Sequence, residues 1–408
     1  MPASSRRSWI GVAPTQADGT LSATYAGGVT SVTISNLTTW TTAAATGQYM
    51  VIVDGNNTEQ VGPITLTGSV VSGITTANAH SANCYVYFQT GANASPAAVS
   101  VTKIDAQDNI AMLGDKGFRG SMASEFGVAQ GMRVGKLSFD ADFFADAAGY
   151  FFNALFGYYA YTSGTPNVYA FSQANNATPT ATPGQPAPLL VYVYNPQSST
   201  TRVFARCVSD SLTLKVDPGS LMSYSVTLMG LASGIVTGPT TIPPAYTTFT
   251  PVPSRVATMS INSAANLKVL SAEYAWKRDN AEAINTLQGI QDPLALYVGP
   301  LDLSIKAKIV PSNDTELNFF LNGTQVPMTL TAVSGTGAAA NGVTVQTTLV
   351  NFNDANVTRD KSYVEIDIDA DALANATDRV DTTVGGLSSS KVTLSTAAAG
   401  TSTQYGKV

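Results

Sequence analysis

The chain has 408 residues, of which 44% are hydrophobic and only 12% are charged, and its formal net charge is −6. Ordinary globular domains carry about 25% charged residues, so a surface built from Ser, Thr, Ala, Gly and Asn is typical of a protein that buries much of itself against other copies, because buried charge is costly. The negative balance leaves no basic surface for gripping nucleic acid. No stretch reaches the roughly 18 to 20 apolar residues that span a membrane, so we expect no membrane partner.

The N-terminal region changes character twice. Residues 1 to 20 are expected to belong to a first β-rich unit that resumes at residue 99. Between these parts, residues 21 to 98 alternate short apolar strands with Gly- and Asn-rich turns, as in YMVIVDGNNTEQV, where DGNN is a strong hairpin signal. This texture predicts a small inserted β module.

Two later segments share one pattern. Residues 135 to 157 read GKLSFDADFFADAAGYFFNALFG, and residues 299 to 323 read GPLDLSIKAKIVPSNDTELNFFLNG. Each begins with Gly, continues as an alternating strand and ends in an apolar helical turn. Asp146 and Asp314 are the expected N-caps, and Gly157 and a second Gly at position 323 are the expected left-handed C-terminal residues. The two segments are offset by 164 residues.

The match continues downstream, where SYSVTLMGL resembles SYVEIDIDADAL and places Tyr224 opposite Tyr363. We interpret the chain as a tandem duplication of one β-rich unit, because self-similarity on this scale fixes an architecture. The predicted order is a first unit over 99 to 234, a Pro/Thr-rich linker over 235 to 254, a second unit over 255 to 395 and a flexible tail over 396 to 408. The fold class is all-β: two tandem β-sandwich or barrel units, each with a short helix, plus the inserted module.

Acidic residues on two strands were the strongest candidates for chemistry. Asp140 and Asp142 lie two apart on one strand face, about 6 to 7 Å from each other, a spacing that glycoside hydrolysis can use. The run EIDIDADA, residues 365 to 372, gathers carboxylates that could hold Ca²⁺, but it lacks the Gly and closing Glu of an EF-hand loop. A polar or solvated strand face explains both, and the cation question stays open.

Nucleophilic catalysis has little support. His80 is the only histidine and has no nucleophile motif beside it, and Cys84 and Cys207 are expected to be buried free thiols. We therefore expect no enzyme activity, no catalytic residue, no cofactor and no metal.

Four segments, taken in order, resemble the tail tube proteins (major tail proteins) of bacteriophages with long, non-contractile tails. They are GKLSFDADFFADAAGYFFNALFG, CVSDSLTLKVDPGSLMSYSVTLMGLAS, EYAWKRDNAEAINTLQGIQDPLALYVGPLDLSIKAKI and NFFLNGTQVPMTLT, and the resemblance covers roughly residues 99 to 395. It implies a structural virion protein, assembled in the host bacterial cytoplasm, that polymerises as stacked rings into the tail tube. The implied partners are other copies, the tape measure protein, tail terminator and tip proteins, and double-stranded DNA in passage.

A conduit should not bind its cargo, so small polar and acidic groups on the channel face would let a polyanion slide. The opposite strand faces should then be core, including Phe139, Phe143, Leu303, Ile305, Val364 and Ile366. The candidate lumen-facing residues are Asp140, Asp142, Asp302, Lys306, Lys308, Glu365, Asp367 and Asp369.

Two units in one chain also predict a stoichiometry. Three chains would supply six tube units, giving a threefold ring with a pseudo-sixfold channel, with a hexamer as the alternative. The loops within 107 to 132 and 278 to 297 are candidates for contacts between stacked rings. The residues proposed for that role are Asp108, Asn109, Arg278, Asp279, Asn280, Gln291, Asp292 and Pro293.

Two other classes fit the composition. A capsid decoration or tail-tip protein would share the low charge and the β content but would not need two equivalent tube units. A carbohydrate-binding β-sandwich adhesin is favoured by the 17 tyrosines and the inserted module, and glycan binding would support it.

Overall fold

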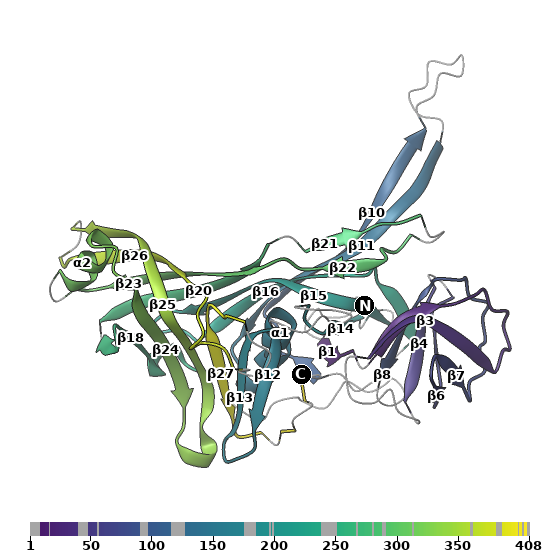
Figure 1. Cartoon of the computed structure of the whole chain (residues 1–408), viewed down its shortest axis with the longest axis horizontal. Coiled ribbons are helices and arrows are strands. Elements are labelled where there is room, and N and C mark those ends of the chain that lie inside the picture. Colours follow the sequence, from purple (N-terminus) through teal and green to yellow (C-terminus); the bar gives the residue numbers. More distant parts are fainter. Residues whose placement is uncertain are drawn as a thin grey trace.

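The structure is a computed structural model of the chain. It describes residues 9 to 405 apart from 16, 40–47, 55–56, 90–96, 116–126, 175–184, 196, 198–199, 238–250, 267, 280, 288–290, 312–313, 360–361, 381–385, 399 and 402–403. Most of the predicted linker therefore lies outside the described residues. The architecture is mostly β, as the alternating sequence predicted, with one large antiparallel strand network and a separate curled sheet near the N-terminus (Figure 1).

The large network contains an eight-stranded antiparallel sheet, here called the long sheet. Its fourth and eighth strands enter it only with their C-terminal halves. In spatial order it consists of β10 (Lys103–Asp115), β11 (Gly127–Asp142), β16 (Ser223–Gly230), β15 (Thr200–Val216), β20 (Val269–Arg278), β23 (Leu301–Ile309), β26 (Glu365–Ala372) and β25 (Asn341–Thr358).

The N-terminal halves of β15 and β25 leave the long sheet and join two outer sheets. The first outer sheet runs β9 (Ala97–Val99), β1 (Ile10–Pro14), β14 (Leu189–Asn195), β15 and β17 (Gly234–Thr237). The second runs β19 (Ala264–Asn266), β18 (Ala257–Ile261), β24 (Val326–Ser334), β25, β27 (Lys391–Thr396), β13 (Asn167–Gln173) and β12 (Gly157–Thr162). Short 3₁₀ turns occupy Ser254–Val256 and Gly337–Ala339.

The same pairing order thus occurs twice, and the irregularities recur with it. β15 has a register shift against β14 between Leu189 and Val191, and β25 has one against β24 between Val326 and Met328. Each long strand also has a bulge against the next strand of the long sheet: β15 against β16 at position 210, and β25 against β26 at position 353. Since bulges are specific local features, they align residue n of β15 with residue n + 143 of β25.

This alignment corrects the register read from the sequence. Val226 of β16 lies opposite Leu212, and Ile368 of β26 lies opposite the equivalent residue of β25, so the two strands differ by 142 positions. Tyr224 therefore corresponds to Ile366, whereas Tyr363 is 44% exposed and precedes β26. The offset of 164 between β11 and β23 becomes 168 for the same reason. Alternation has a period of two, so it fits offsets of 164 and 168 equally well, whereas the pairing of Tyr224 with Tyr363 uses an odd offset that alternation does not support.

The two predicted helices exist but differ in burial. α1 (Ala145–Phe156) is buried on all sides, while α2 (Thr315–Leu321) has no buried residue. The left-handed glycines are confirmed, with φ of 85° at Gly157 and 60° at Gly323. The N-cap prediction is wrong for Asp146, because α1 starts after Phe144 and the aspartate lies inside the first turn. Asp314 does occupy the N-cap of α2, without a side-chain capping bond.

Helix α1 forms the centre of the main core. The Phe151 ring lies 4.8 Å from that of Phe139 on β11, and the Phe152 ring lies 5.8 Å from that of Trp276 on β20. Each such aromatic contributes about 1.5 to 3 kcal/mol through burial. One helix therefore packs against both halves of the long sheet and fixes which face is core. The predicted core residue Val364 is a misassignment, since it precedes β26 and is 37% exposed.

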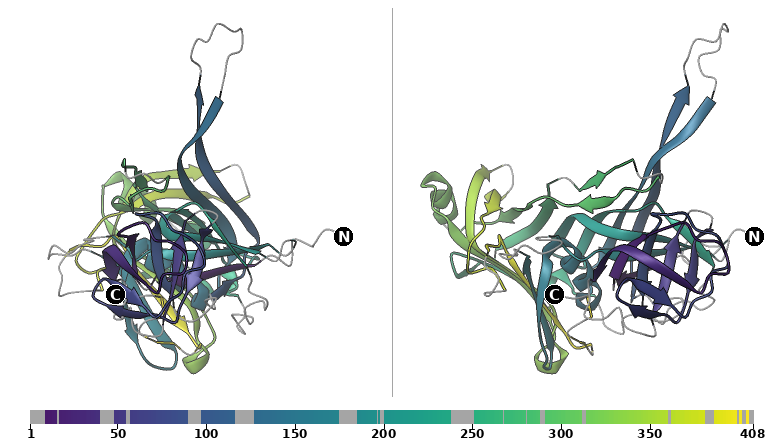
Figure 2. Two further views of the ribbon diagram at one scale, coloured as in Figure 1. Left: turned by 90° about the vertical axis from the view of Figure 1, so that its right-hand side faces the viewer. Right: turned by 45° about the vertical axis from the view of Figure 1, so that its right-hand side comes forward.

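The N-terminal module is a seven-stranded sheet that curls around its own apolar core (Figure 2). Val53, Tyr85 and Tyr87 of the module pack in one cluster with Tyr192 and other residues of the first outer sheet, so the module is fixed to the body. Its order is β5 (Glu59–Val61), β4 (Tyr49–Val53), β8 (Tyr85–Gln89), β2 (Ala17–Leu21), β3 (Ser31–Thr39), β7 (Val70–Ser72) and β6 (Thr65–Thr67).

Tyr405 is anchored, although it lies in the segment expected to be a flexible tail. Tyr405 is fully buried, its hydroxyl donates to the Asp146 carbonyl at 3.0 Å, and its own carbonyl accepts from Asn153 at 2.7 Å. Its ring also stacks edge-on against Tyr169. An aromatic core position near the chain end was not visible in the polar sequence around it.

Candidate functional site

Alternation gives the long sheet one apolar and one polar face, and the polar face is the first candidate surface. In β23 the residues alternate between buried and partly or fully exposed along the whole strand. Successive strands place their outward residues opposite one another, which builds rows across the sheet. One such row contains Asp142, Ser223, Lys215, Glu273, Lys306, Asp369 and Asp354.

Charges of opposite sign face each other along these rows. The ammonium of Lys215 lies 3.4 Å from the Glu273 carboxylate, and that of Lys308 lies 3.0 Å from the Asp367 carboxylate. These groups are about half exposed, so each pair adds only about 0 to 1 kcal/mol to stability. Their effect is on the electric field of the face. Further lysines opposite acidic residues are Lys103 at Asp140, Lys277 at Asp302 and Lys306 at Asp369.

The polar face is hollowed near its centre. A depression of about 440 Å³ spans β15, β20, β23, β26 and β25. Its lining includes Lys215, Glu273, Lys306, Lys308, Asp367 and Asp369. The lining also includes Asp217 and Asp354, so five carboxylates accompany three ammonium groups and the depression is net acidic.

The predicted lumen residues converge on this face with one exception. Asp140 accepts a hydrogen bond of 2.6 Å from Ser225, and Asp302 is exposed on β23. Glu365 is the exception, because it is only 3% exposed at the end of β26 and cannot line an open surface. The others, which project from the polar face, are Asp140, Asp142, Asp302, Lys306, Lys308, Asp367 and Asp369.

Two arms continue from one end of the long sheet, and they are the second candidate surface: the first stands away from the body, and the second lies along it, with Leu296 and Val298 buried against the first outer sheet (Figure 1). The first is the distal part of β10 and β11, and the second is the segment 279 to 300, which carries β21 (Glu282–Ile284) and β22 (Ala295–Tyr297). Arg133 joins them, because its guanidinium donates to both Asp292 carboxylate oxygens, at 2.7 and 2.9 Å. The Arg133 backbone N–H also donates to the Gln291 carbonyl at 3.1 Å.

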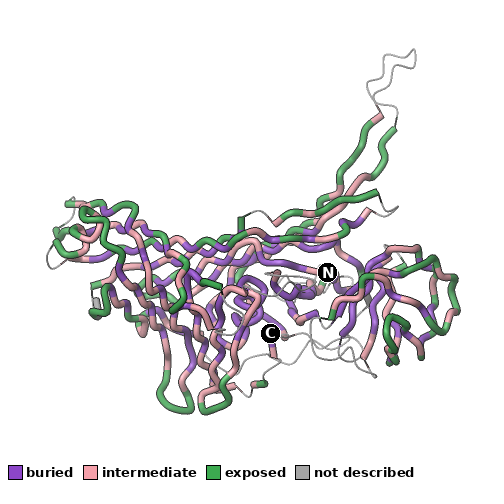
Figure 3. Tube along the Cα trace, in the orientation of Figure 1, coloured by how far each residue is buried: buried purple, intermediate pink, exposed green. Residues whose placement is uncertain are grey.

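The arms carry apolar residues that nothing in the described chain covers. Leu287 is fully exposed, and large parts of the other side chains are also open to solvent. Figure 3 shows the arms as mostly exposed or partly exposed above a buried sheet. Exposed apolar residues gathered on one feature indicate an interaction surface. They are Met112, Leu113, Val128, Ile284, Leu287, Leu294 and Tyr297.

The predicted stacking residues separate into two groups. Asn109 and Asp279 are exposed, and Gln291 is partly exposed, whereas Asn280 lies outside the described residues. Asp108 binds Arg202 at 2.9 Å, so it braces the base of the first arm. Asp292, Pro293 and Arg278 are buried and cannot reach another ring, which corrects these three predictions.

Arg278 has a different role, because its guanidinium reaches the C-terminal end of α1. It donates to the carbonyls of Leu155 and Phe156, at 2.5 to 3.5 Å, and to that of Gly299 at 3.0 Å. These helix-end carbonyls have no intrahelical donor and carry partial negative charge. Burial lowers the pKa of Arg278 to about 10, which leaves it protonated at neutral pH.

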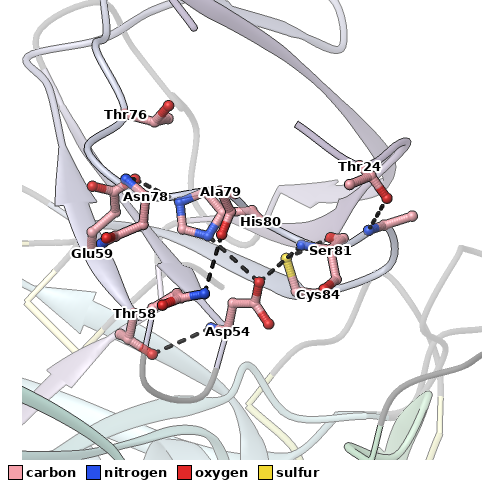
Figure 4. A network of polar contacts seen from close by, with 12 residues as sticks. Thr24, Asp54, Thr58, Glu59, Thr76, Asn78, Ala79, His80, Ser81 and Cys84 are labelled. Atoms are coloured by element: carbon pink, nitrogen blue, oxygen red, sulfur yellow. Dashed lines mark hydrogen bonds and ion pairs between the residues drawn. The ribbon is translucent and has the colours of Figure 1, made fainter. Parts of the chain in front are cut away.

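The only histidine lies in a polar network within the module (Figure 4). His80 is buried, with Nε2 2.5 Å from a Glu59 carboxylate oxygen and Nδ1 3.7 Å from Asp54. Glu59 also accepts from the backbone N–H groups of Ala77 and Asn78, just before His80, and Asp54 accepts from the Ser81 N–H at 2.9 Å. The network therefore ties a loop to the β4–β5 hairpin and presents no accessible nucleophile.

The cysteines, the acidic residues and the tryptophans do not form a reactive or ligand-binding site among the residues that the structure describes. Cys84 and Cys207 are buried free thiols, as predicted, and burial raises the pKa of Cys84 to about 12. Among the residues that the structure describes, no group of three or more His, Cys, Asp or Glu is placed to hold a metal ion. Trp9 and Trp276 are buried, so neither forms an exposed sugar-binding platform. Within the described ranges, no helix is both long and apolar enough to cross a membrane.

A polar sheet face with matched charges and a pair of apolar arms define a structural β protein. A family model described as phage tail tube protein matches residues 128–372, which is more than half of the chain. The chain belongs to the phage tail tube protein family, and its role is structural, in the virion tail, and not enzymatic. A search of curated proteins found no match.

The role of Arg278 leads to a stability prediction. Replacing it in Arg278→Met removes both guanidinium donors from the buried Leu155 carbonyl, while the Phe156 carbonyl keeps the Ala174 N–H, so we expect the free energy of unfolding to fall by about 2 to 4 kcal/mol. Urea unfolding of the unassembled chain measures this. Lys277→Met is the matched control, since Lys277 is the exposed neighbour on the same strand, and it should change stability by less than about 0.5 kcal/mol. Equal effects of both variants would contradict the assigned role.

Proposed function

We propose that the chain polymerises as stacked rings into a non-contractile tail tube, with the polar face of the long sheet lining the channel through which genome DNA passes. The observation that carries this is the pairing of β15 with β20, which makes one continuous sheet with a core face and a charge-matched, hollowed face. Family membership supports self-assembly in the tail. Assembly would occur in the host cytoplasm, with the tape measure protein, terminator and tip proteins as partners.

Each chain, in this proposal, contains two tube units. The recurring strand order and the bulges at positions 210 and 353 support a duplication. The first unit would contain β1 and residues 97 to 234, because β2 belongs to the sheet of the module and β9 pairs with β1, and the second would span 255 to 395. The units interlock, because the β12–β13 hairpin of the first pairs with β27 of the second. The module, which runs from β2 to β8, packs on the first outer sheet, away from the polar face, which supports an external position.

Geometry favours three chains per ring over six. Each chain supplies eight strands to the long sheet, so three chains give 24 strands and six give 48. Strands about 4.8 Å apart and tilted by about 40° close 24 strands at a backbone diameter of about 48 Å, and 48 strands at about 96 Å. The first leaves a bore of about 38 Å after side chains of about 5 Å. The second would admit several duplexes side by side.

The channel surface is suited to a sliding polyanion because its lysines are neutralised in place. A phosphate backbone binds through unpaired Lys and Arg and the counterions that they release. On this face five lysines stand directly opposite acidic residues, whereas Lys136 stands between Gln107 and Met229, so little free positive charge is presented. We propose that Asp140, Glu273, Asp302, Asp367 and Asp369 act in this way, and that Asp142, which stands opposite Ser223, adds negative charge to the same face.

The arms are the proposed contacts between rings. They extend along the strand direction beyond the sheet, which points them at the rim of a ring, and they expose apolar side chains. The contact would use the exposed residues of the arms, with Asn109, Asp279 and Gln291 at its edge. The Arg133–Asp292 pair would hold the two arms together as one surface.

Ring composition is the primary test of this function. We expect electron microscopy of the concentrated protein to show tubes, and native mass measurement of dissociated rings to give three copies. Six copies per ring would reject the threefold arrangement. A protein that stays monomeric at every concentration would reject the function itself.

Charge on the channel face should control DNA movement. In Asp302→Lys the new lysine stands opposite Lys277, so each chain presents two unneutralised cations, and we expect slower DNA ejection that recovers at high salt. Ejection kinetics of phage carrying the variant measure this. The double variant Asp302→Lys with Lys277→Asp restores the pair and should eject normally. Unchanged kinetics in the single variant would remove these residues from the channel.

Apolar residues on the second arm should be needed for stacking. Charges introduced by Ile284→Glu and Leu287→Glu would have to be buried between rings, so we expect single rings in place of tubes. Sedimentation and negative-stain imaging distinguish the two. Val70→Glu, an equally exposed apolar site on the module, is the control and should leave tube length unchanged. Normal tubes from the arm variant would exclude these residues from the stacking contact.

A further inference from the structure

The long sheet ends in two bare strand edges. Over the residues that the structure describes, the Lys103–Ile110 part of β10 pairs only with β11, and the C-terminal half of β25, from residue 351 to 358, pairs only with β26. Unpaired edges normally recruit another strand, and proteins blunt those that must stay free with proline, short length or a covering segment. Neither edge contains proline. Both edges are therefore suited to pairing with another chain.

The chain already contains one joint of this kind. β15 of the first half pairs with β20 of the second half, and the register runs from Ser211 opposite Lys277 to Val216 opposite Ala272. The duplicated order makes β25 the equivalent of β15, and β10 the equivalent of β20. Inside the chain β15 and β20 pair with each other, whereas their equivalents at the bare edges, β25 and β10, do not pair with each other.

Residue equivalences follow from the sheet register. The shared bulges align β15 with β25 at +143. Val226 of β16 and Ile368 of β26 are equivalent at the 142-residue offset. Phe139 of β11 lies opposite Val226, and Ala307 of β23 lies opposite Ile368, so Phe139 corresponds to Ala307. Ile104 lies opposite Phe139, and Ala272 lies opposite Ala307, so β20 aligns with β10 at −168.

We propose, on the basis of the ring assembly proposed above, that the C-terminal half of β25 in one copy pairs antiparallel with β10 of the next copy, in the register of the internal β15–β20 joint. Applying the two offsets to that joint gives three facing pairs on the polar side of the sheet. They are Asp354 with Asn109, Asn356 with Gln107, and Thr358 with Asp105 of the neighbouring copy.

The side chains suit this register. Each facing pair joins a donor to an acceptor, and no like charges lie opposite each other. On the core side, Val357 would face Ala106, and Ala355 would face Asp108. The Asp108 carboxylate is already bound by Arg202 and Ser233. Arg202 also donates to the Ala106 carbonyl at 3.1 Å, and since a carbonyl oxygen has two lone pairs, that bond leaves room for a second donor.

The unequal burial of the helices is an independent observation in favour of this joint. α1 is buried because β25 and β27 of the second half close over it, besides strands of its own half. α2 contacts β25 of its own half, has no buried residue, and leaves Leu321 66% exposed. A neighbouring copy joined through β10 would bring its β15 and β17 to α2, as β25 and β27 come to α1. The same joint thus covers the exposed helix.

Cysteine pairs test the register directly. Facing residues of antiparallel strands have Cα atoms about 4.5 to 5.5 Å apart, within the range of a disulfide, whereas diagonal neighbours lie about 7 to 8 Å apart. The in-register double variants are Asp354→Cys with Asn109→Cys, and Asn356→Cys with Gln107→Cys. The crossed controls, Asp354→Cys with Gln107→Cys and Asn356→Cys with Asn109→Cys, use the same four substitutions. The native Cys84 and Cys207 are buried and do not interfere.

After mild oxidation of assembled tubes, we expect both in-register variants to run as covalent trimers on non-reducing gels and both crossed variants to run as monomers. Electron microscopy of the same samples separates the two proposals. Rings or tubes in which the crossed pairs cross-link, or in which no pair does, would overturn the register and leave the tail tube function standing. A chain that forms no rings in any variant or in the parent would overturn both.

Discussion

Backbone pairing between β15 and β20 is the constraint on which the rest of the structure depends. It joins six residues of the first half of the chain to six of the second, from Ser211–Val216 to Ala272–Lys277, and so turns two partial sheets into one. Because side chains alternate across a strand, this joint also sets a common core face for both halves. α1 can then pack against Phe139 of the first half and Trp276 of the second at once.

The two long strands make this arrangement possible. β15 and β25 each cross from an outer sheet to the long sheet, and each bulges just after the crossing, at positions 210 and 353. A bulge adds a residue and increases the local twist, which lets one strand serve two sheets that diverge. The space between the diverging sheets is filled by α1, whose C-terminal carbonyls are held by Arg278. Core, sheet and helix end are therefore one connected unit.

Two features of charge, opposite charges that face each other and exposed surfaces with few charges, suit different parts of the proposed tube. On the polar face, carboxylates stand opposite lysines, so the surface is hydrated but has little net attraction for a polyanion. The arms expose apolar side chains, and the bare part of β25 carries a single charged residue, Asp354, which lowers the desolvation cost of contacts between copies. The proposed tube needs both properties in one chain.

Strand alternation, the two helical turns and their terminal glycines could be predicted from the sequence, because these depend on neighbours within a few residues. The polar faces containing Asp140, Asp302 and Asp367 were predictable for the same reason. The alignment of Tyr224 with Tyr363 was wrong because it matched two aromatic residues without keeping the alternation of core-facing and outward-facing positions. Which positions face the core is decided by long-range contacts. Glu365 and Arg278 were assigned to surfaces because sequence alone does not show that a charged residue is buried at a strand end.

By itself, then, the sequence determined the β class, the period of each strand and a surface poor in charge, all of which are local or compositional. The tertiary structure decided what depends on partners far along the chain: the buried Tyr405, the guanidinium of Arg278 at the end of α1, and the pairing of Arg133 with Asp292. It also decided which strand edges are left bare. Those edges are defined by the pairing of all the other strands in the sheet, since a strand's hydrogen-bonding partner depends on the sheet and not on its own residues alone.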